Sequence, residues 1–216
     1  AGFQDAYRVE LLPPDADPLD VRYSMINWAD RATRGWSYGQ TIIDPRTGEI
    51  LKGSVVLGAL RVRQDMLIFE GLVGAHMTGK GGPNDPAEVA LARLRQLGAH
   101  EVGHSIGFAH NFAGSTQGRT SVMDYPAPRI LLKDGRPDLS EAYAVGIGDW
   151  DKVTVAAVYG PEDQAQALLH QNATAPEGLR YITDADSRGL SVGQPWGSLW
   201  DDGPDPAAEL TRMMAV

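Results

Sequence analysis

Residues 100–110 have the sequence HEVGHSIGFAH and contain three of the five histidines in this chain of 216 residues. On a helix, His100 and His104 lie four residues apart on one face, so both imidazoles can point at one position. Gly107 allows the chain to turn sharply after such a helix, and His110 can then return as a third ligand. Three nitrogen ligands leave the fourth position of a tetrahedral zinc ion open for water, which is typical of a catalytic site.

Glu101 lies on a neighbouring face of the same predicted helix, near the metal but free not to bind it. Five His and nine Glu among 216 residues give about 0.005 chance matches to the pattern HExxH. The chain has no cysteine, so any transition-metal site must use His, Asp or Glu. We therefore predict a Zn²⁺ site formed by His100, His104 and His110. The alternatives are coincidental histidines and a zinc site without catalysis.

The residues before the motif favour a helix from Pro86 to about Ile106. Asp85 can cap its first turn, Pro86 suits the first helical position, and Glu88 completes the pattern of a capping box. Gly107 is well placed to end the helix in a left-handed conformation. The motif thus has the helical context that its chemistry requires.

Strands are expected mainly in the first third of the chain. Residues 21–25 alternate between apolar and polar side chains, which predicts a half-buried strand. The apolar segments 41–43 and 49–51 flank the sequence DPRTG at residues 44–48, where Pro and Gly favour the turn of a hairpin. Residues 55–62 are predicted to form a third strand.

The apolar run at residues 66–73 fits either a helix or a strand. A second helix is predicted from Asp149 to Tyr159, because Gly and Pro follow it directly. Beyond Pro161 the chain is richer in polar residues, Gly and Pro, so little regular structure is expected before a short helix at residues 207–216. The first residues do not resemble a signal peptide and the last resemble an interrupted helix. We therefore expect an internal piece of a longer polypeptide.

The pattern HExxHxxGxxH of residues 100–110 resembles that of the metzincin clan of zinc metallopeptidases. Members of this clan carry a methionine-containing turn beneath the metal, and Ser121–Tyr125 is similar to that turn. The resemblance implies that Met123 forms an apolar floor under the three imidazoles, supported by the turn at Gly107. It also implies that Tyr125 reaches the metal or the reacting carbonyl, as in astacins and serralysins. A packed aromatic ring with a structural hydrogen bond is the alternative role for Tyr125.

Taken whole, the chain is similar to the catalytic part of large bacterial zinc-dependent metalloproteases. The resemblance covers about residues 21–160 and is carried by four strings, which are residues 44–50, 110–112, 121–126 and 146–151. It implies an α+β, metzincin-like fold with a twisted, mainly N-terminal sheet, an active-site helix and a smaller irregular C-terminal subdomain.

The resemblance also implies a division of the chain. We expect a catalytic domain over residues 1–160, with an upper subdomain at 1–107 and a lower subdomain at 108–160. Residues 161–216 would then form a C-terminal extension, in contact with the remaining domains of the longer polypeptide.

The activity that the resemblance implies is zinc-dependent hydrolysis of peptide bonds. Glu101 would take a proton from water and pass it to the leaving amine, and the Tyr125 hydroxyl would help to stabilise the oxyanion. A peptide or protein substrate would lie along an exposed sheet edge, for which we predict the strand at residues 55–62. The alternative is a catalytically silent, zinc-bound module that grips peptides within a larger protein. Resemblance to exported bacterial peptidases implies a periplasmic or extracellular location.

The composition argues against two other classes of protein. The chain has 19 basic and 28 acidic residues, a net charge of −9, and no run of basic residues. Binding to nucleic acid or to an anionic membrane surface is therefore not expected. No apolar stretch approaches the roughly 18 to 20 residues needed to cross a bilayer. A hydrophobic content of 43% is ordinary for a globular protein and excludes wholesale disorder.

Other residues that could carry chemistry have simpler interpretations. Asp124 is either a partner of a metal ligand or a turn residue, and we favour the turn. The pairs Asn84–Asp85 and Asp184–Asp186 lack the ligand pattern of a calcium loop, so we assign them to turns and caps. His76 and His170 have no partners at metal-ligand spacing and are expected to be structural or solvated. Three tryptophans are expected in the core: Trp28, Trp36 and Trp150.

Overall fold

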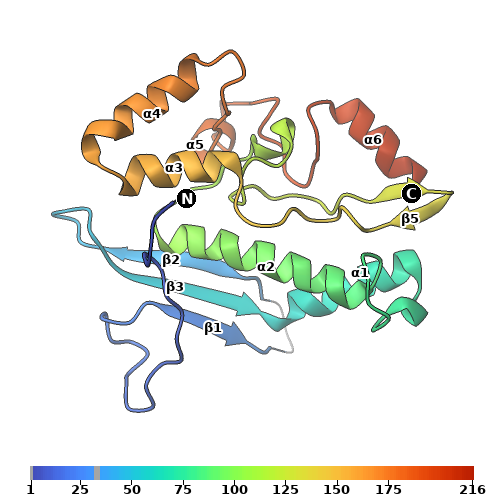
Figure 1. Ribbon diagram of the computed structural model, residues 1–216, viewed down its shortest axis with the longest axis horizontal. Helices are drawn as coiled ribbons and strands as arrows, with labels where there is room; N and C mark the ends of the chain where they lie inside the picture. The colour runs from blue at the N-terminus through green and yellow to red at the C-terminus, as the bar shows by residue number, and fades with distance from the viewer. Residues whose placement is uncertain (1, 32–34) are drawn as a thin grey trace.

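A small mixed sheet lies beneath a long central helix in the computed structural model, which describes residues 2–31 and 35–216 (Figure 1). The strands are β1 (Met25–Ala29), β2 (Tyr38–Ile43) and β3 (Ile50–Gly58), in the order β1-β3-β2. β1 runs parallel to β3, and β2 runs antiparallel to it. The helix α2 (Pro86–Ser105) runs between this sheet and the C-terminal half of the chain. The fold is the predicted α+β arrangement.

The predicted hairpin is confirmed. β2 and β3 are joined through residues 44–48, where Gly48 has a φ of +78° and donates its N–H to the Asp44 carbonyl at 2.8 Å. A register shift at Ile42/Ile43 accommodates the turn. β2 is an outer strand of the sheet and lies against α2 at Gly39, so the hairpin places an edge strand next to the central helix.

The prediction of a strand at residues 21–25 is wrong in position, because the observed strand begins where the predicted one ends. β1 begins only at Met25, because Asp20 holds the preceding residues in a turn. Its carboxylate accepts from the backbone N–H of Arg22 at 2.9 Å and from the Arg22 guanidinium. Such local side-chain bonds compete with the ladder of a sheet.

The prediction for residues 55–62 is also wrong, in two respects. β3 ends at Gly58, and α1 (Ala59–Val73) begins directly after it. An ion pair between Arg61 and Asp65, four residues apart, supports the helix, and the ambiguous run at 66–73 lies in it. In addition, β3 is the central strand with partners on both sides, so it cannot offer an edge to a peptide.

The first residue of α2 and the residue that caps it are as predicted. Asp85 is its N-cap, and its carboxylate accepts from the backbone N–H of Ala87 at 2.9 Å. The same carboxylate accepts from the N–H groups of Gly79 and Gly81, so the loop before the helix is fixed to its first turn. The assignment of Asp85 to a cap rather than a calcium ligand is therefore confirmed.

The C-terminal half contains more helix than the sequence predicts. α3 (Asp149–Tyr159) is confirmed, but α4 (Glu162–Thr174) follows it where little regular structure was expected. Leu168 and Leu169 are the only large apolar side chains of α4, so it lacks the apolar stripe that reveals a helix in sequence. The other elements of this half are η2 (Gly114–Gln117), β4 (Leu131–Lys133), β5 (Arg136–Asp138), α5 (Asp184–Ser187) and α6 (Pro206–Ala215); η1 (Ala75–Met77) lies before α2.

Only one of the three tryptophans expected in the core is buried. Trp150 is 9% exposed, whereas Trp28 is 53% and Trp36 is 64% exposed. Trp28 lies in the middle of β1, an edge strand whose three central residues are exposed, and Trp36 lies in the loop before β2. His76 and His170 are exposed, as expected.

Two clusters of buried side chains lie in the described residues. One joins α1, α2 and the segment around β4 and β5, and consists of Phe69, Val89, Ile130, Leu139, Ala142 and Tyr143. The other joins Phe112 and Ala113 to Ile182, with Tyr125 packed against it. Part of the segment beyond residue 160 is thus packed onto the chain that follows the HExxH helix.

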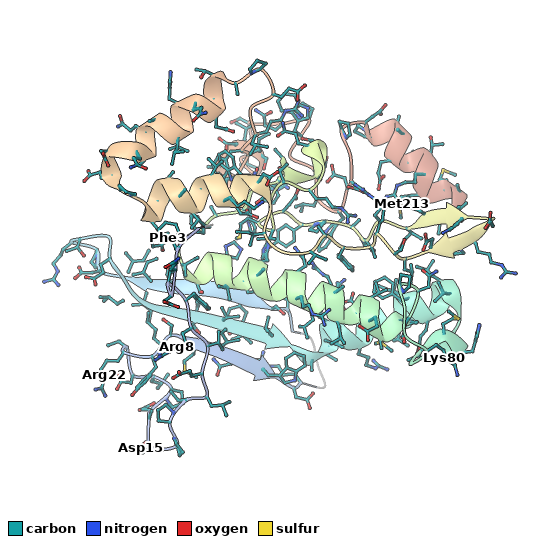
Figure 2. All side chains as sticks on the ribbon, in the orientation of Figure 1. Phe3, Arg8, Asp15, Arg22, Lys80 and Met213 are labelled. Atoms are coloured by element: carbon teal, nitrogen blue, oxygen red, sulfur yellow. The ribbon has the colours of Figure 1, made fainter. Side chains whose placement is uncertain are left out.

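The described residues before β1, residues 2–24, form no helix or strand, and Phe3 and Arg8 mark the course of this segment in Figure 2. Within this segment, Tyr7 lines an apolar cavity of about 520 Å³ between α2 and α3. No helix in the described parts of the chain, 2–31 and 35–216, is long and apolar enough to span a membrane.

Candidate metal centre

The structure brings the three predicted histidines together at the C-terminal end of α2. The Nε2 atom of His104 lies 3.2 Å from Nε2 of His100 and 3.1 Å from Nε2 of His110. His100 and His104 come from the last two turns of the helix, and His110 comes from the segment after it. The three rings therefore converge through their Nε2 atoms.

Each ring is held by a hydrogen bond at its other nitrogen. Nδ1 of His100 lies 2.7 Å from the Val122 carbonyl, and Nδ1 of His104 lies 2.7 Å from the Phe108 carbonyl. A carbonyl can only accept, so both Nδ1 atoms carry the proton and both Nε2 atoms present a lone pair.

His110 is held by a carboxylate instead. Its Nδ1 lies 2.7 Å from Oδ2 of Asp184, which belongs to α5. A carboxylate on the outer nitrogen of a metal-binding histidine fixes the ring and increases its basicity. The assignment of Asp184 to a turn or cap thus misses its contact with the site.

These nitrogens fit a zinc ion. Zn–N bonds of 2.0–2.1 Å in a tetrahedron place ligand nitrogens about 3.3–3.4 Å apart, close to the spacing of these Nε2 atoms. Three lone pairs that face one another repel unless a cation lies between them. The ligand atoms of the three histidines all lie within 4.8 Å of one another, so the cluster is consistent with zinc binding.

The electrostatics of the site favour neutral imidazoles, which is the form that binds a metal. His100 is almost fully buried, and burial together with the charge of His104 lowers the pKa of His100 to about 3. Burial also lowers the pKa of His104. The lone pairs of these rings are thus available for a cation across the neutral pH range.

Glu101 is 4% exposed and lies between the helix and the edge strand β2. Burial raises the pKa of its carboxyl to about 7, while the N–H of Gly39 and the charge of Arg93 act in the opposite direction. Glu101 lies beside His100 in sequence but is not one of the three clustered ligands. This is the placement that the motif predicts.

Gly39 allows β2 to approach α2 closely. A Cβ atom at this position would lie 2.0 Å from the backbone oxygen of Glu101 and 2.8 Å from Cβ of His104. Such distances are sterically forbidden, so only glycine permits this contact. The edge strand therefore crosses the helix at the residues that carry the chemistry.

Met123 packs directly against α2. It is 4% exposed, and a Cβ atom at Gly103 would lie 2.3 Å from its sulfur. Gly103 is the residue before His104, so the methionine side chain lies against the turn of helix between the two helical histidines. Gly107 has a φ of +95°, the left-handed conformation expected where the helix ends.

Asp151 ties the methionine turn to α3. Its carboxylate accepts from the Ser121 hydroxyl at 2.6 Å, from the Val122 N–H at 2.8 Å and from the Gly148 N–H at 2.7 Å. Burial nevertheless raises the pKa of Asp151. Since the Val122 carbonyl in turn holds His100, the carboxylate supports a ligand through the turn.

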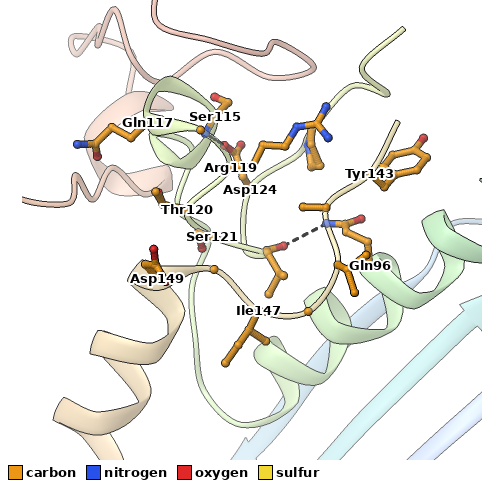
Figure 3. A pocket seen from close by; sticks show the side chains of 17 residues that line it. Gln96, Ser115, Gln117, Arg119, Thr120, Ser121, Asp124, Tyr143, Ile147 and Asp149 are labelled. Carbon is orange, nitrogen blue, oxygen red and sulfur yellow. Dashed lines mark hydrogen bonds between the residues drawn. The ribbon is translucent and has the colours of Figure 1, made fainter. Parts of the chain in front are cut away.

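Asp124 is a turn residue, as we favoured. It is 2% exposed, and its carboxylate accepts from the Ser115 N–H at 2.6 Å and from its neighbour Tyr125 N–H at 2.7 Å. Burial raises the pKa of Asp124 to about 7. A pocket of about 260 Å³ lies behind this turn, where Gln96 donates to the Val122 carbonyl (Figure 3).

Tyr125 lies against the histidine cluster. The centre of its ring is 5.2 Å from that of His100 and 4.7 Å from that of His110. Its other neighbours are the rings of Phe112 and Trp200. Burial raises the pKa of the Tyr125 hydroxyl, which keeps it protonated and able to donate.

A histidine cluster at the end of a helix, followed by a glycine turn and with a buried methionine packed against the helix, fits a zinc site of the metzincin class. The chain belongs to the Met-zincin family, which matches it over residues 82–216. The expected metzincin clan, the α+β fold and the zinc cofactor are thereby confirmed. The family points to zinc metallopeptidases in general. No curated protein and no solved structure matches the chain.

Proposed function

We propose that this protein is a zinc-dependent endopeptidase in which Glu101 is the general base. The observation that carries the proposal is the convergence of three Nε2 atoms, each on a ring fixed at Nδ1, beside a buried carboxylate on the same helix. In this proposal His100, His104 and His110 bind the metal. Bound zinc would supply a Lewis acid that polarises a carbonyl and lowers the pKa of water from 15.7 to about 7.

Glu101 would move the proton during peptide hydrolysis. Its carboxylate takes a proton from the attacking water and then gives it to the leaving amine, so that the glutamate returns to its first state. The backbone N–H of Gly39 in β2 faces this carboxylate and stabilises its charged form. That hydrogen bond would help to orient the carboxylate beside the metal ligands.

Tyr125 would donate a hydrogen bond to the oxyanion that forms on the scissile carbonyl. Its ring contacts both His100 and His110, so the hydroxyl belongs to the same small site. Preorganised donors of this kind stabilise a transition state because they need no reorientation during the reaction. A purely structural role in the cluster with Phe112 is the competing assignment.

A peptide substrate would bind along β2. Within the described residues, β1 and β2 are the outer strands of the sheet, and β2 is the one that contacts α2 at Glu101. An extended peptide gains main-chain hydrogen bonds from such an edge with little demand on its sequence. This edge replaces the one predicted at residues 55–62.

The second candidate function is a zinc-bound module that holds peptides without cutting them. A fluorogenic peptide library, assayed with and without a chelator, separates the two. The endopeptidase predicts cleavage that chelation abolishes and added zinc restores. Peptide binding without cleavage at full zinc loading would favour the silent module.

We also propose the wider setting that the sequence suggests. The chain would be the catalytic part of a longer bacterial polypeptide in the periplasm or outside the cell, with residues 161–216 as an extension of a domain over 1–160. The absence of cysteine is compatible with an oxidising compartment. Fractionation of producing cells, followed by detection of the chain in each compartment, tests the location.

A further inference from the structure

A pocket of about 670 Å³ opens beside Glu101. Three of its lining residues, Arg93, Leu97 and Glu101, lie four residues apart along α2 and so share one face of the helix. The pocket is also lined by Arg61 of α1 and by the aromatic side chains Trp36 and Trp200. Tyr125 also lines it, so the pocket adjoins the candidate reaction centre.

Arg93 is the unusual member of this lining. Its side chain is 4% exposed, and its Nη1 donates to Oε1 of Gln96. Among the described residues, its Nε has no hydrogen-bond partner, and none of their ion pairs includes Arg93. The guanidinium also lies over the ring of Tyr143, with Cζ 5.6 Å from the ring centre, but no carboxylate of the described residues pairs with it. A buried guanidinium without a carboxylate partner is costly, and burial lowers the pKa of Arg93.

The second arginine of the pocket does not share this problem. Arg61 forms an ion pair with Asp65, in which Nη2 lies 2.6 Å from Oδ1 and Nε lies 3.1 Å from Oδ2. That pair is neutral in sum, so Arg93 leaves this end of the pocket with one excess positive charge. Arg93 and Glu101 lie at opposite ends of the pocket. They are eight residues apart in α2, or about 12 Å along the helix axis.

We propose that this pocket binds the side-chain carboxylate of a substrate residue next to the scissile bond, with Glu preferred to Asp. This inference rests on the proposed peptidase function and names the class of substrate. A ligand carboxylate would give Arg93 the partner that it lacks, in a place where charge-assisted hydrogen bonds are strong.

The rest of the lining fits a long acidic side chain. Leu97 is 8% exposed and offers an apolar surface midway between Glu101 and Arg93, against which the methylene groups of a Glu side chain can pack. Trp36 and Trp200 are 64% and 52% exposed and supply aromatic walls at the opening. A shorter Asp side chain reaches less far toward Arg93, because Arg93 lies two turns beyond Glu101.

The test compares peptides that are identical except for Glu, Gln or Asp on either side of one cleavable bond. Cleavage by the zinc-loaded protein is measured as kcat/KM. Binding of versions with a reduced, non-hydrolysable bond is measured in parallel as Kd by fluorescence anisotropy. We expect the Glu peptide to be favoured over the Gln peptide at least tenfold in both measurements, and the Asp peptide to lie between them.

Variants assign the preference to Arg93. Arg93→Met should reduce the ratio of Glu to Gln to within twofold, and Arg93→Lys should retain part of it. Arg95→Met, an exposed arginine two residues along the same helix, should leave the ratio unchanged. If Arg93→Met does not fold, the ratio of Glu to Gln peptides measured with the wild-type protein still tests whether the pocket binds a carboxylate.

The outcomes separate this inference from the proposed function. Cleavage with equal kcat/KM for Glu and Gln peptides would overturn the pocket assignment and leave the peptidase standing. Preferential binding of the Glu peptide without any cleavage would support the pocket and overturn the peptidase. A preference that survives Arg93→Met would also overturn the pocket assignment.

Discussion

Oδ2 of Asp184 lies 2.7 Å from Nδ1 of His110, although 74 residues separate the two in sequence. Asp184 belongs to the four-residue helix α5, and the chain just before it is hydrogen-bonded to the segment that follows His110. Ile182 accepts the N–H of Phe112 at 2.8 Å and donates its own N–H to the side chain of Asn111 at 3.1 Å. The segment beyond residue 160 therefore helps to place the third histidine.

Replacing Asp184 should weaken metal binding without removing a ligand. In Asp184→Ala, the ring of His110 loses the partner that fixes its tautomer, and we expect zinc to bind 10–100-fold more weakly. Competition with a coloured chelator measures this change. The exposed residue Asp163 of α4 supplies the control, since Asp163→Ala should keep the wild-type affinity. Equal affinities in all three proteins would show that the contact is incidental.

Gly103 should not tolerate a methyl group. In Gly103→Ala the new Cβ lies 2.3 Å from the sulfur of Met123, so either the turn or the helix must shift. Overpacking of this kind costs about 1–3 kcal/mol, which corresponds to a fall in Tm of roughly 2–12 °C for a chain of this size. Thermal unfolding followed by circular dichroism measures it.

Gly98 provides the matched control for that substitution. It lies in the same helix, and a Cβ atom there meets nothing within 4 Å. Gly98→Ala should raise stability by about 0.5–1 kcal/mol, because alanine favours a helix over glycine. A Gly103→Ala protein as stable as Gly98→Ala would contradict the packing of Met123 against α2.

Asp151 should prove important for the methionine turn. In Asp151→Asn, a carboxylate that accepts from Ser121, Val122 and Gly148 becomes an amide whose NH₂ group faces donors. We expect the free energy of unfolding to fall by about 2–3 kcal/mol, as for the loss of a buried, charged acceptor. Urea unfolding measures this loss. Asp149→Asn, at the exposed first residue of α3, should change little. Similar losses in both variants would contradict the role of Asp151 in holding the methionine turn to α3.

Because of Asp202, the free energy of unfolding should fall as the pH is lowered. Burial raises the pKa of Asp202, but the hydrogen bond from Arg129 and the charge of Arg119 outweigh burial and bring it below its ordinary value. Nη2 of Arg129 lies 2.8 Å from Oδ1 of this carboxylate. The folded state thus binds the proton less readily than the unfolded state. Its contribution is present above the ordinary pKa of Asp, about 3.9, and is lost as the pH falls through the folded-state pKa.

The experiment compares wild-type and Asp202→Asn proteins by urea unfolding between pH 6 and pH 3, both in the presence of a chelator so that zinc binding does not contribute. The wild-type protein should be more stable at pH 6, and the difference should shrink toward pH 3. Two curves that stay parallel over this range would contradict the assignment.

The sequence was sufficient for the parts of the site that depend on local geometry. The i,i+4 spacing of His100 and His104, the cap at Asp85 and the turn at Gly107 each follow from the short-range rules of helices, and each lies where predicted. The hairpin at residues 44–48 follows from turn chemistry in the same way.

The errors have both local and tertiary causes. The strand predicted at residues 55–62 ends at Gly58, because the ion pair of Arg61 with Asp65 and the packing of α1 on α2 favour a helix after it. The contacts of Asp184 with His110 and of Asp151 with the methionine turn join residues 29 or more apart. No spacing rule reaches that far in one sequence, so only the folded chain reveals these partners.

The central claim is that Glu101 carries the proton during peptide hydrolysis. Its most direct test is kcat/KM for peptide cleavage by Glu101→Gln, relative to wild type, with the zinc content of both proteins measured. The proposal predicts one zinc per chain in both proteins and a 10²–10⁴-fold fall in kcat/KM for the variant. Equal kcat/KM at equal zinc content would contradict it.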